Sequence, residues 1–257
     1  MLAIFDKELA NAPKELNSPA SMMPGSKKPK LPQEILSLHD PNHNGFHMNF
    51  GNAATLAYLP KHHDAHFSVH QRLFCGLDDI YCLFLGSLNN LCSLKKQYGL
   101  TSKGINEAMF VIEAYRTLRD RGPYPADQVV KDLEGCFAFI IYDNKSKTVF
   151  ISLSSDGGIK LYWGIAADGS IVICDNLEVI KGSCAKSFAP FPVGCMFHSE
   201  GGLKNYEHPI NKMKAMPRVD SEGVMCGASF NVDSHAKIHS MPRVGSEANW
   251  SAAWESH

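Results

Sequence analysis

Residues 133–143 read LEGCFAFIIYD, and this stretch carries the strongest structural signal in the chain. A glycine precedes seven consecutive apolar residues (136–142), and Asp143 and Asn144 follow them as turn formers. A short apolar run bounded by turn residues is typical of a strand that is buried on both faces. Comparable runs occupy residues 1–5, 54–59, 80–86, 148–153, 160–165 and 170–174. The chain is therefore expected to form buried sheets.

Residues 106–133 carry helical spacing instead. Asn106 is a good N-cap, and apolar residues recur on one helix face at positions 108, 111, 112, 115 and 118. Gly122-Pro123 is expected to end this helix, and a second helix is expected over residues 125–133. Strands in runs, with helices in a separate block, predict an α+β protein.

The composition is that of an ordinary globular chain. Of 257 residues, 44% are hydrophobic and 20% charged, and the net charge is −1. Because positive and negative charges balance, the chain as a whole has no excess positive charge that would attract nucleic acid. No apolar run approaches the roughly 18 residues that a membrane-spanning helix needs. Charges from Asp6 onward argue against a secretory leader. We expect a cytoplasmic protein, with the nucleus possible through the basic run at 27–30, and no membrane insertion.

The eight cysteines are scattered and form no Cys-x-x-Cys pair, which indicates free thiols in a reducing compartment. A relocated catalytic thiol is an alternative that the sequence leaves open. Its candidates are Cys75, Cys82, Cys92 and Cys136, which lie in or beside apolar strands. Burial there would raise the thiol pKa and suppress reactivity.

Residues 133–143 resemble the segment LDGMFAFALYD of class II glutamine amidotransferase domains, as found in asparagine synthetase. Residues 155–164 (SDGGIKLYWG) are similar to their RDRLGIKPLYYG, residues 83–90 (LFLGSLNN) stand where they carry NGEIYN, and residues 1–5 (MLAIF) stand where they carry MCGIF. A narrower resemblance is to plant aluminium-induced, stem-specific-type proteins, whose marks YGL and LRDR occur at residues 98–100 and 118–121.

The amidotransferase resemblance implies an N-terminal-nucleophile hydrolase-like fold, an αββα sandwich of two antiparallel sheets between helix layers. It implies a class II amidotransferase-like domain over residues 1–205. Residues 206–257 would then be an extension that packs on the same domain or on a partner chain.

The resemblance also locates a glutaminase site, and this chain departs from it. The family attacks glutamine with an N-terminal Cys thiol, but position 2 is Leu2. Gly86 of the oxyanion hole is kept, whereas its Asn position is Leu85, and the Arg that clamps the substrate carboxylate falls at Pro60. In the family an acidic residue holds the substrate amine, and Glu107 stands at that position here. We therefore expect a vestigial pocket (Leu2, Leu85, Gly86 and Glu107), no catalytic residues, no cofactor and no glutaminase activity.

The two narrower motifs are predicted to support structure. In Tyr98-Gly99-Leu100, the glycine is expected to adopt a positive φ. In Leu118-Arg119-Asp120-Arg121, the arginines place positive charge at a helix C-terminus and Asp120 is expected to pair with one of them. An interaction site at these motifs remains an alternative.

Histidines offer a metal-binding alternative. His62, His66 and His70 recur at four-residue spacing, as do His39, His43 and His47, and imidazole suits zinc, copper or nickel rather than Al³⁺. Because loop histidines are common, we expect no metal site.

The last fifty residues hold an imperfect repeat, MPRVDSE at 216–222 and MPRVGSE at 241–247. Apolar residues there, with Trp250 and Trp254 near the end, are costly to leave in water and favour an interface. We expect a homodimer, with fold-back onto the chain's own sheet as the alternative; the sequence identifies no small-molecule ligand.

Overall fold

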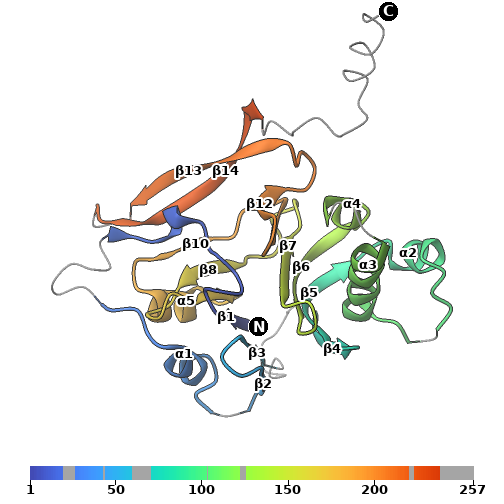
Figure 1. Cartoon of the computed structure of the whole chain (residues 1–257), viewed down its shortest axis with the longest axis horizontal. Coiled ribbons are helices and arrows are strands. Elements are labelled where there is room, and N and C mark those ends of the chain that lie inside the picture. The colour runs from blue at the N-terminus through green and yellow to red at the C-terminus, as the bar shows by residue number, and fades with distance from the viewer. Residues whose placement is uncertain are drawn as a thin grey trace, which may run out of the picture.

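Two six-stranded antiparallel sheets lie face to face in the computed structural model, which describes residues 1–19, 27–42, 44–59, 71–102, 104–121, 126–219 and 223–237 (Figure 1). The first sheet has the order β10-β8-β9-β1-β3-β2 and the second β12-β11-β7-β6-β5-β4. In the first, the strands are β1 (Leu2–Phe5), β2 (Phe46–Asn49), β3 (Ala54–Tyr58), β8 (Tyr162–Ile165), β9 (Ile171–Cys174) and β10 (Phe188–Pro190). In the second, they are β4 (Gln71–Leu77), β5 (Ile80–Leu88), β6 (Gly135–Asp143), β7 (Thr148–Leu153), β11 (Cys195–His198) and β12 (Gly202–Asn205).

The predicted two-sided burial of residues 136–142 is confirmed in β6. Ala138, Ile140 and Tyr142 belong to the core between the two sheets. Phe137, Phe139 and Ile141 belong to a second core, between the second sheet and its helices. A central strand with both faces covered has no solvent-facing positions, which is why the stretch shows no polar alternation.

Helices cover the outer face of each sheet. The helices α2 (Leu91–Gln97), α3 (Glu107–Arg121) and α4 (Ala126–Lys131) pack on the second sheet, and α1 (Pro32–His39) and α5 (Leu177–Cys184) pack on the first (Figure 1). The predicted cap of α3 is confirmed, because the Met109 N–H donates to Asn106 Oδ1 at 2.9 Å. The α+β class and the αββα layering are therefore those that we expected.

A third, two-stranded sheet lies across the end of the sandwich. It is a hairpin of β13 (Asn211–Val219) and β14 (Met225–Lys237), and a short 3-10 helix, Lys14–Leu16, lies near β14. Ala228 and Phe230 of β14 join the core between the sheets, and the Phe230 ring lies 5.4 Å from that of Trp163. The hairpin thus packs on its own chain through one face.

Candidate functional site

The N-terminal end of β1 is filled by apolar side chains. Leu2 is fully buried in the core between the first sheet and the helices α1 and α5, where it belongs to the same cluster as Ile35 and Ile180. Met1 is 1% exposed and points instead into the core between the sheets. The start of this strand therefore offers no side chain that could act as a nucleophile.

A buried carboxylate, Asp175, holds two cations at this strand end. Its Oδ1 lies 2.7 Å from the Met1 α-ammonium, its Oδ2 accepts a hydrogen bond from Arg72 Nη2, and its side chain is 5% exposed. Burial raises the pKa of Asp175, but the Met1 ammonium and Arg72 outweigh it and hold that pKa below its ordinary value. The carboxylate is therefore ionised and the α-amine is engaged in an ion pair.

His39 lies beside this pair at the end of α1 and is 6% exposed. Burial and then the nearby Met1 ammonium lower its pKa from 6.5 to about 4, so that its imidazole is neutral at physiological pH. Among the described residues its Nδ1 has no hydrogen-bond partner. His39 also lines a cavity of about 110 Å³, with Phe46 and Tyr58 on other walls. Sequence reasoning missed the grouping of His39, Arg72 and Asp175, because these residues are far apart in the chain.

Gly86, which stands at the predicted oxyanion position, packs closely against β6. Gly86 has a φ of +111°, and a Cβ on it would lie 2.0 Å from the Cys136 carbonyl oxygen and 2.6 Å from Ile159 Cδ1. Its neighbour Leu85 belongs to the core between the sheets. Gly86 is thus needed for the close approach of β6 to β5, a role that does not depend on catalysis.

The four residues of the expected vestigial pocket occupy three places. Leu2 faces α1 and α5, Leu85 and Gly86 lie on β5 in the second sheet, and Glu107 begins α3 on the outer side of that sheet. Pro60, His62, His66 and His70 lie outside the described residues.

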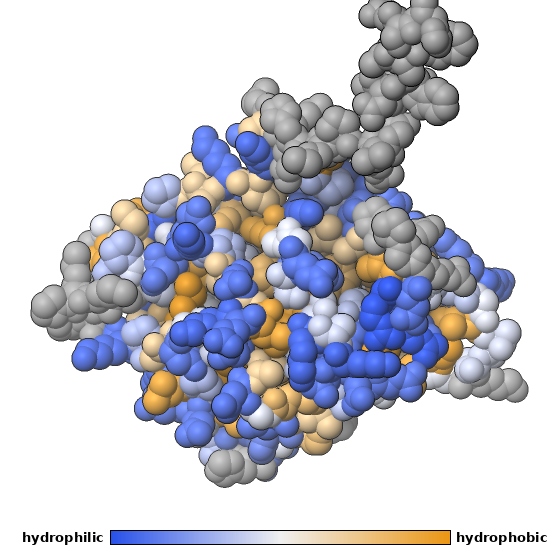
Figure 2. All heavy atoms as spheres, viewed as in Figure 1, coloured by the Kyte–Doolittle hydropathy of each residue, from blue (hydrophilic) through white to orange (hydrophobic). Residues whose placement is uncertain are grey.

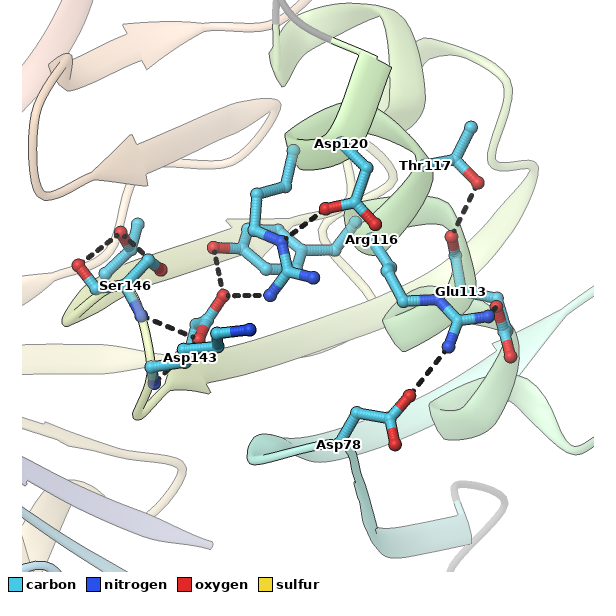
Figure 3. A network of polar contacts seen from close by, with 11 residues as sticks. Asp78, Glu113, Arg116, Thr117, Asp120, Asp143 and Ser146 are labelled. Carbon is cyan, nitrogen blue, oxygen red and sulfur yellow. Dashed lines mark hydrogen bonds and ion pairs between the residues drawn. The ribbon is translucent and has the colours of Figure 1, made fainter.

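The LRDR motif ties α3 to the turn between β6 and β7. Arg119 Nη1 lies 2.8 Å from Asp143 Oδ2, and its Nε donates to Asp120 Oδ1 at 2.8 Å. The Asp143 side chain is 0% exposed and also accepts bonds from the Tyr115 hydroxyl and from the backbone N–H groups of Lys145 and Ser146. Figure 3 shows Asp120 and Asp143 on either side of one guanidinium, with Ser146 at the turn. The predicted pairing of Asp120 is confirmed.

These contacts explain the charge state of Asp143. Burial raises the pKa of its carboxyl, but the Ser146 N–H and the Arg119 guanidinium outweigh burial and leave that pKa below its ordinary value. Asp143 therefore stays ionised at the end of β6 and anchors the turn to α3. The Arg121 side chain lies outside the described part of the chain.

The YGL motif ends α2. Gly99 has a φ of +68°, as predicted, which lets the Leu100 N–H donate to the Lys95 carbonyl at 2.8 Å and close the helix. The Tyr98 ring meets Phe110 of α3 edge-on, with ring centres 5.2 Å apart. The motif thus joins α2 to α3.

Two cavities flank α3 near these motifs. One, of about 550 Å³, is lined by Arg119, His198 and Lys204, and the other, of about 290 Å³, by Tyr98 and Thr117; Leu118 borders both. The larger has the size of a small-molecule site. No spacing in the sequence indicated the larger cavity, because β11 and β12 reach α3 only in the folded chain.

Comparison with known proteins decides the family. A family model described as "Aluminium induced protein" matches residues 2–232. The chain belongs to the aluminium-induced protein family. The stem-specific protein TSJT1 of Nicotiana tabacum is 37% identical to it over 155 residues, which cover 59% of this chain and 99% of that protein.

More distant similarity links this aluminium-induced protein to amidotransferases. A probable glutamine-hydrolysing asparagine synthetase of Dictyostelium discoideum is 38% identical over 74 residues, 29% of this chain and 13% of the synthetase. The chain thus spans well under a fifth of that enzyme. The glutamine phosphoribosylpyrophosphate amidotransferase from B. subtilis is 16% identical in sequence, with a TM-score of 0.44 over 63% of this chain and 36% of that one.

Most thiols of this aluminium-induced protein are held in the protonated form. Burial raises the pKa of Cys75 and Cys82, and burial together with the Asp156 carboxylate raises the pKa of Cys136 to about 11. Cys92 differs from our expectation, because it lies exposed on α2 rather than beside a strand. The thiols of Cys75, Cys82 and Cys136, whose pKa values are raised, are therefore poor nucleophiles.

Among the residues that the structure describes, no helix is both long and apolar enough to cross a membrane. No group of three or more His, Cys, Asp or Glu side chains among these same residues is arranged to hold a metal ion.

Proposed function

We propose that this aluminium-induced protein is a non-catalytic relative of class II amidotransferases that acts by binding or self-association in a stress response. The observation that carries the proposal is at the start of β1, where Leu2 stands at the nucleophile position and is fully buried. The α-amine, which would serve as the base in the related enzymes, is paired with Asp175 at 2.7 Å.

The chemistry of the reaction supports this reading. Loss of the nucleophile alone costs on the order of 10⁶-fold in comparable hydrolases, and loss of one oxyanion donor costs roughly 10²–10³-fold. Here Leu replaces both the thiol and the oxyanion amide, at positions 2 and 85. The raised pKa values of Cys75, Cys82 and Cys136 speak against a nucleophile relocated to these thiols.

A glutamine hydrolysis assay tests the proposal. Purified full-length protein is expected to release no glutamate from glutamine above a heat-inactivated sample, while an active glutamine-hydrolysing asparagine synthetase in the same assay gives the positive signal. Glutamate release that scales with protein concentration would overturn the proposal.

For the mode of action we propose a two-fold homodimer in the cytoplasm, with residues 1–205 as the amidotransferase-like domain and residues 206–257 as the associating extension. The β13–β14 hairpin supports this. Met216, Val219 and Met225 are 47%, 62% and 46% exposed on it, although its other face packs on the sandwich. Exposed apolar side chains grouped on one hairpin are typical of an interface, and two-fold dimers are the commonest closed symmetry.

A further inference from the structure

The β4–β5 hairpin brings two cysteines face to face. Its turn is Asp78-Asp79, and both residues have a positive φ, 49° and 63°, as a two-residue hairpin turn requires. This turn sets a register in which Cys75 of β4 lies directly opposite Cys82 of β5. Directly paired residues place their side chains on the same side of a sheet, and here both join the core beneath α3.

A third sulfur comes from the helix above the hairpin. Cys75 Sγ lies 3.9 Å from Sδ of Met109, in the first turn of α3. With metal–sulfur bonds of about 2.3 Å, three sulfurs around one trigonal cation lie roughly 4 Å from one another. The separation of Cys75 and Met109 therefore matches one edge of such a site without movement of the backbone.

We propose that Cys75, Cys82 and Met109 form a binding site for a thiophilic monovalent cation, namely Cu(I). Two thiolates and a thioether are the ligands that Cu(I) prefers, and hard cations such as Al³⁺ select oxygen instead. The site lies on the outer face of the second sheet, under α3, and shares no residue with the vestigial pocket expected from the sequence.

Binding is a coordination step that changes no oxidation state. Each thiol loses its proton to solvent as its sulfur bonds to the cation, so one Cu(I) displaces two protons and the Met109 thioether donates a lone pair. Burial raises the pKa of both thiols, and the free protein therefore keeps them protonated until the cation displaces the protons.

The position of Cys75 gives the cation a way in. Strand β4 is the edge of its sheet and, among the described residues, pairs only with β5. Cys75 is half-buried at this edge, whereas Cys82 behind it is fully buried. A cation can therefore bind Cys75 first and then Cys82 and Met109, and the single negative charge of the complex stays near solvent.

The experiment is a copper competition with the reduced full-length protein under anaerobic conditions. Cu(I) is supplied as its bicinchoninate complex, and the fall in the absorbance of this complex reports transfer to the protein. Wild type is expected to withdraw one Cu(I) per chain. Cys75→Ser and Met109→Leu are expected to weaken this binding at least tenfold, and Met109→Leu nearly conserves the volume of the side chain, so that folding is retained. Cys92→Ser and Cys136→Ser remove thiols outside the site and serve as controls.

Each result of the copper competition either supports the three-sulfur site or contradicts it. Binding that is lost in Cys75→Ser and Met109→Leu but kept in both controls supports the site, as does a native mass increase of one copper minus two protons. Equal binding by wild type and Met109→Leu, loss of binding with Cys92→Ser or Cys136→Ser, or no withdrawal of copper by wild type overturns it.

Discussion

Asp175 sets the electrostatics of the residues around Met1. The Met1 ammonium and Arg72 flank the buried Asp175 carboxylate, and the neutral His39 imidazole lies beside them with Asp40 as a second nearby anion. The buried ion pair with Asp175 holds the Met1 α-ammonium in place at the start of β1.

The first prediction at the residue scale concerns restoration of the nucleophile. Leu2→Cys is expected to yield no glutaminase activity, because Leu85 supplies no oxyanion donor and Pro60 cannot clamp the substrate carboxylate. Glutamate release is the measurement, with the unmodified chain as the control. Turnover by this single variant would mean that the other replaced positions are dispensable.

A second prediction concerns His39. Its folded pKa of about 4 lies below the ordinary value of 6.5, so between these values the unfolded chain binds a proton that the folded chain does not. The stability gained by keeping His39 neutral is complete above pH 6.5 and is lost as the pH falls toward 4. We expect the free energy of unfolding to fall by about 2–3 kcal/mol more in wild type than in His39→Gln between pH 7 and 4.5.

Urea denaturation at the two pH values measures this difference. His47→Gln is the matched control, because His47 lines the same cavity but is exposed. The same pH dependence in wild type and His39→Gln would show that His39 is not buried in its neutral form.

At the scale of the element, α3 joins the second sheet through one buried and one exposed ion pair. Arg119 reaches the fully buried Asp143, whereas Arg116, one turn earlier, reaches Asp78, whose side chain is 62% exposed (Figure 3). Both arginines lie on α3 and carry the same charge. Loss of Arg119 would leave a buried carboxylate without its cation, whereas loss of Arg116 would leave an exposed one.

The third prediction uses this contrast. Arg119→Ala should lower the free energy of unfolding by about 2–3 kcal/mol, because it leaves the buried Asp143 charge without its cation. Arg116→Ala should cost less than about 1 kcal/mol, since solvent screens its partners. Chemical denaturation of the two variants is the measurement, and equal losses would contradict the structural role assigned to the LRDR motif.

At the scale of the whole molecule, the sandwich hides its apolar residues well. On the face shown in Figure 2, polar residues predominate and apolar ones appear as small separate patches. The β13–β14 hairpin, with Met216, Val219 and Met225 exposed, departs from this pattern.

The fourth prediction is the oligomeric state. Light scattering across a concentration series is expected to give about twice the chain mass of 28.3 kDa. Met216→Glu combined with Val219→Glu should return the chain to a monomer, because charged groups would be buried without partners. Lys212→Glu, exposed on the same strand, is the control. A mass near 28.3 kDa at every concentration would end the dimer proposal.

Local sequence determined much of the architecture of this protein. The apolar run at 136–142 and the cap at Asn106 predicted β6 and α3, because strand burial and helix capping depend on residues close together in the chain. Boundaries were less accurate: the expected strand at 160–165 begins at Tyr162, and the expected helix at 125–133 is Ala126–Lys131. The leucine at position 2, on which the proposed absence of glutaminase activity rests, was likewise evident from the sequence.

Only the tertiary structure decided which side chains meet. His39 lies on α1, Arg72 on β4 and Asp175 between β9 and α5, and Met109 reaches Cys75 only because α3 packs across β4. Sequence spacing carries no record of such contacts, since they depend on sheet order and on the packing of helices over strands. The ion pair at Met1, the cavities beside α3 and the three-sulfur cluster therefore became visible only in the folded chain.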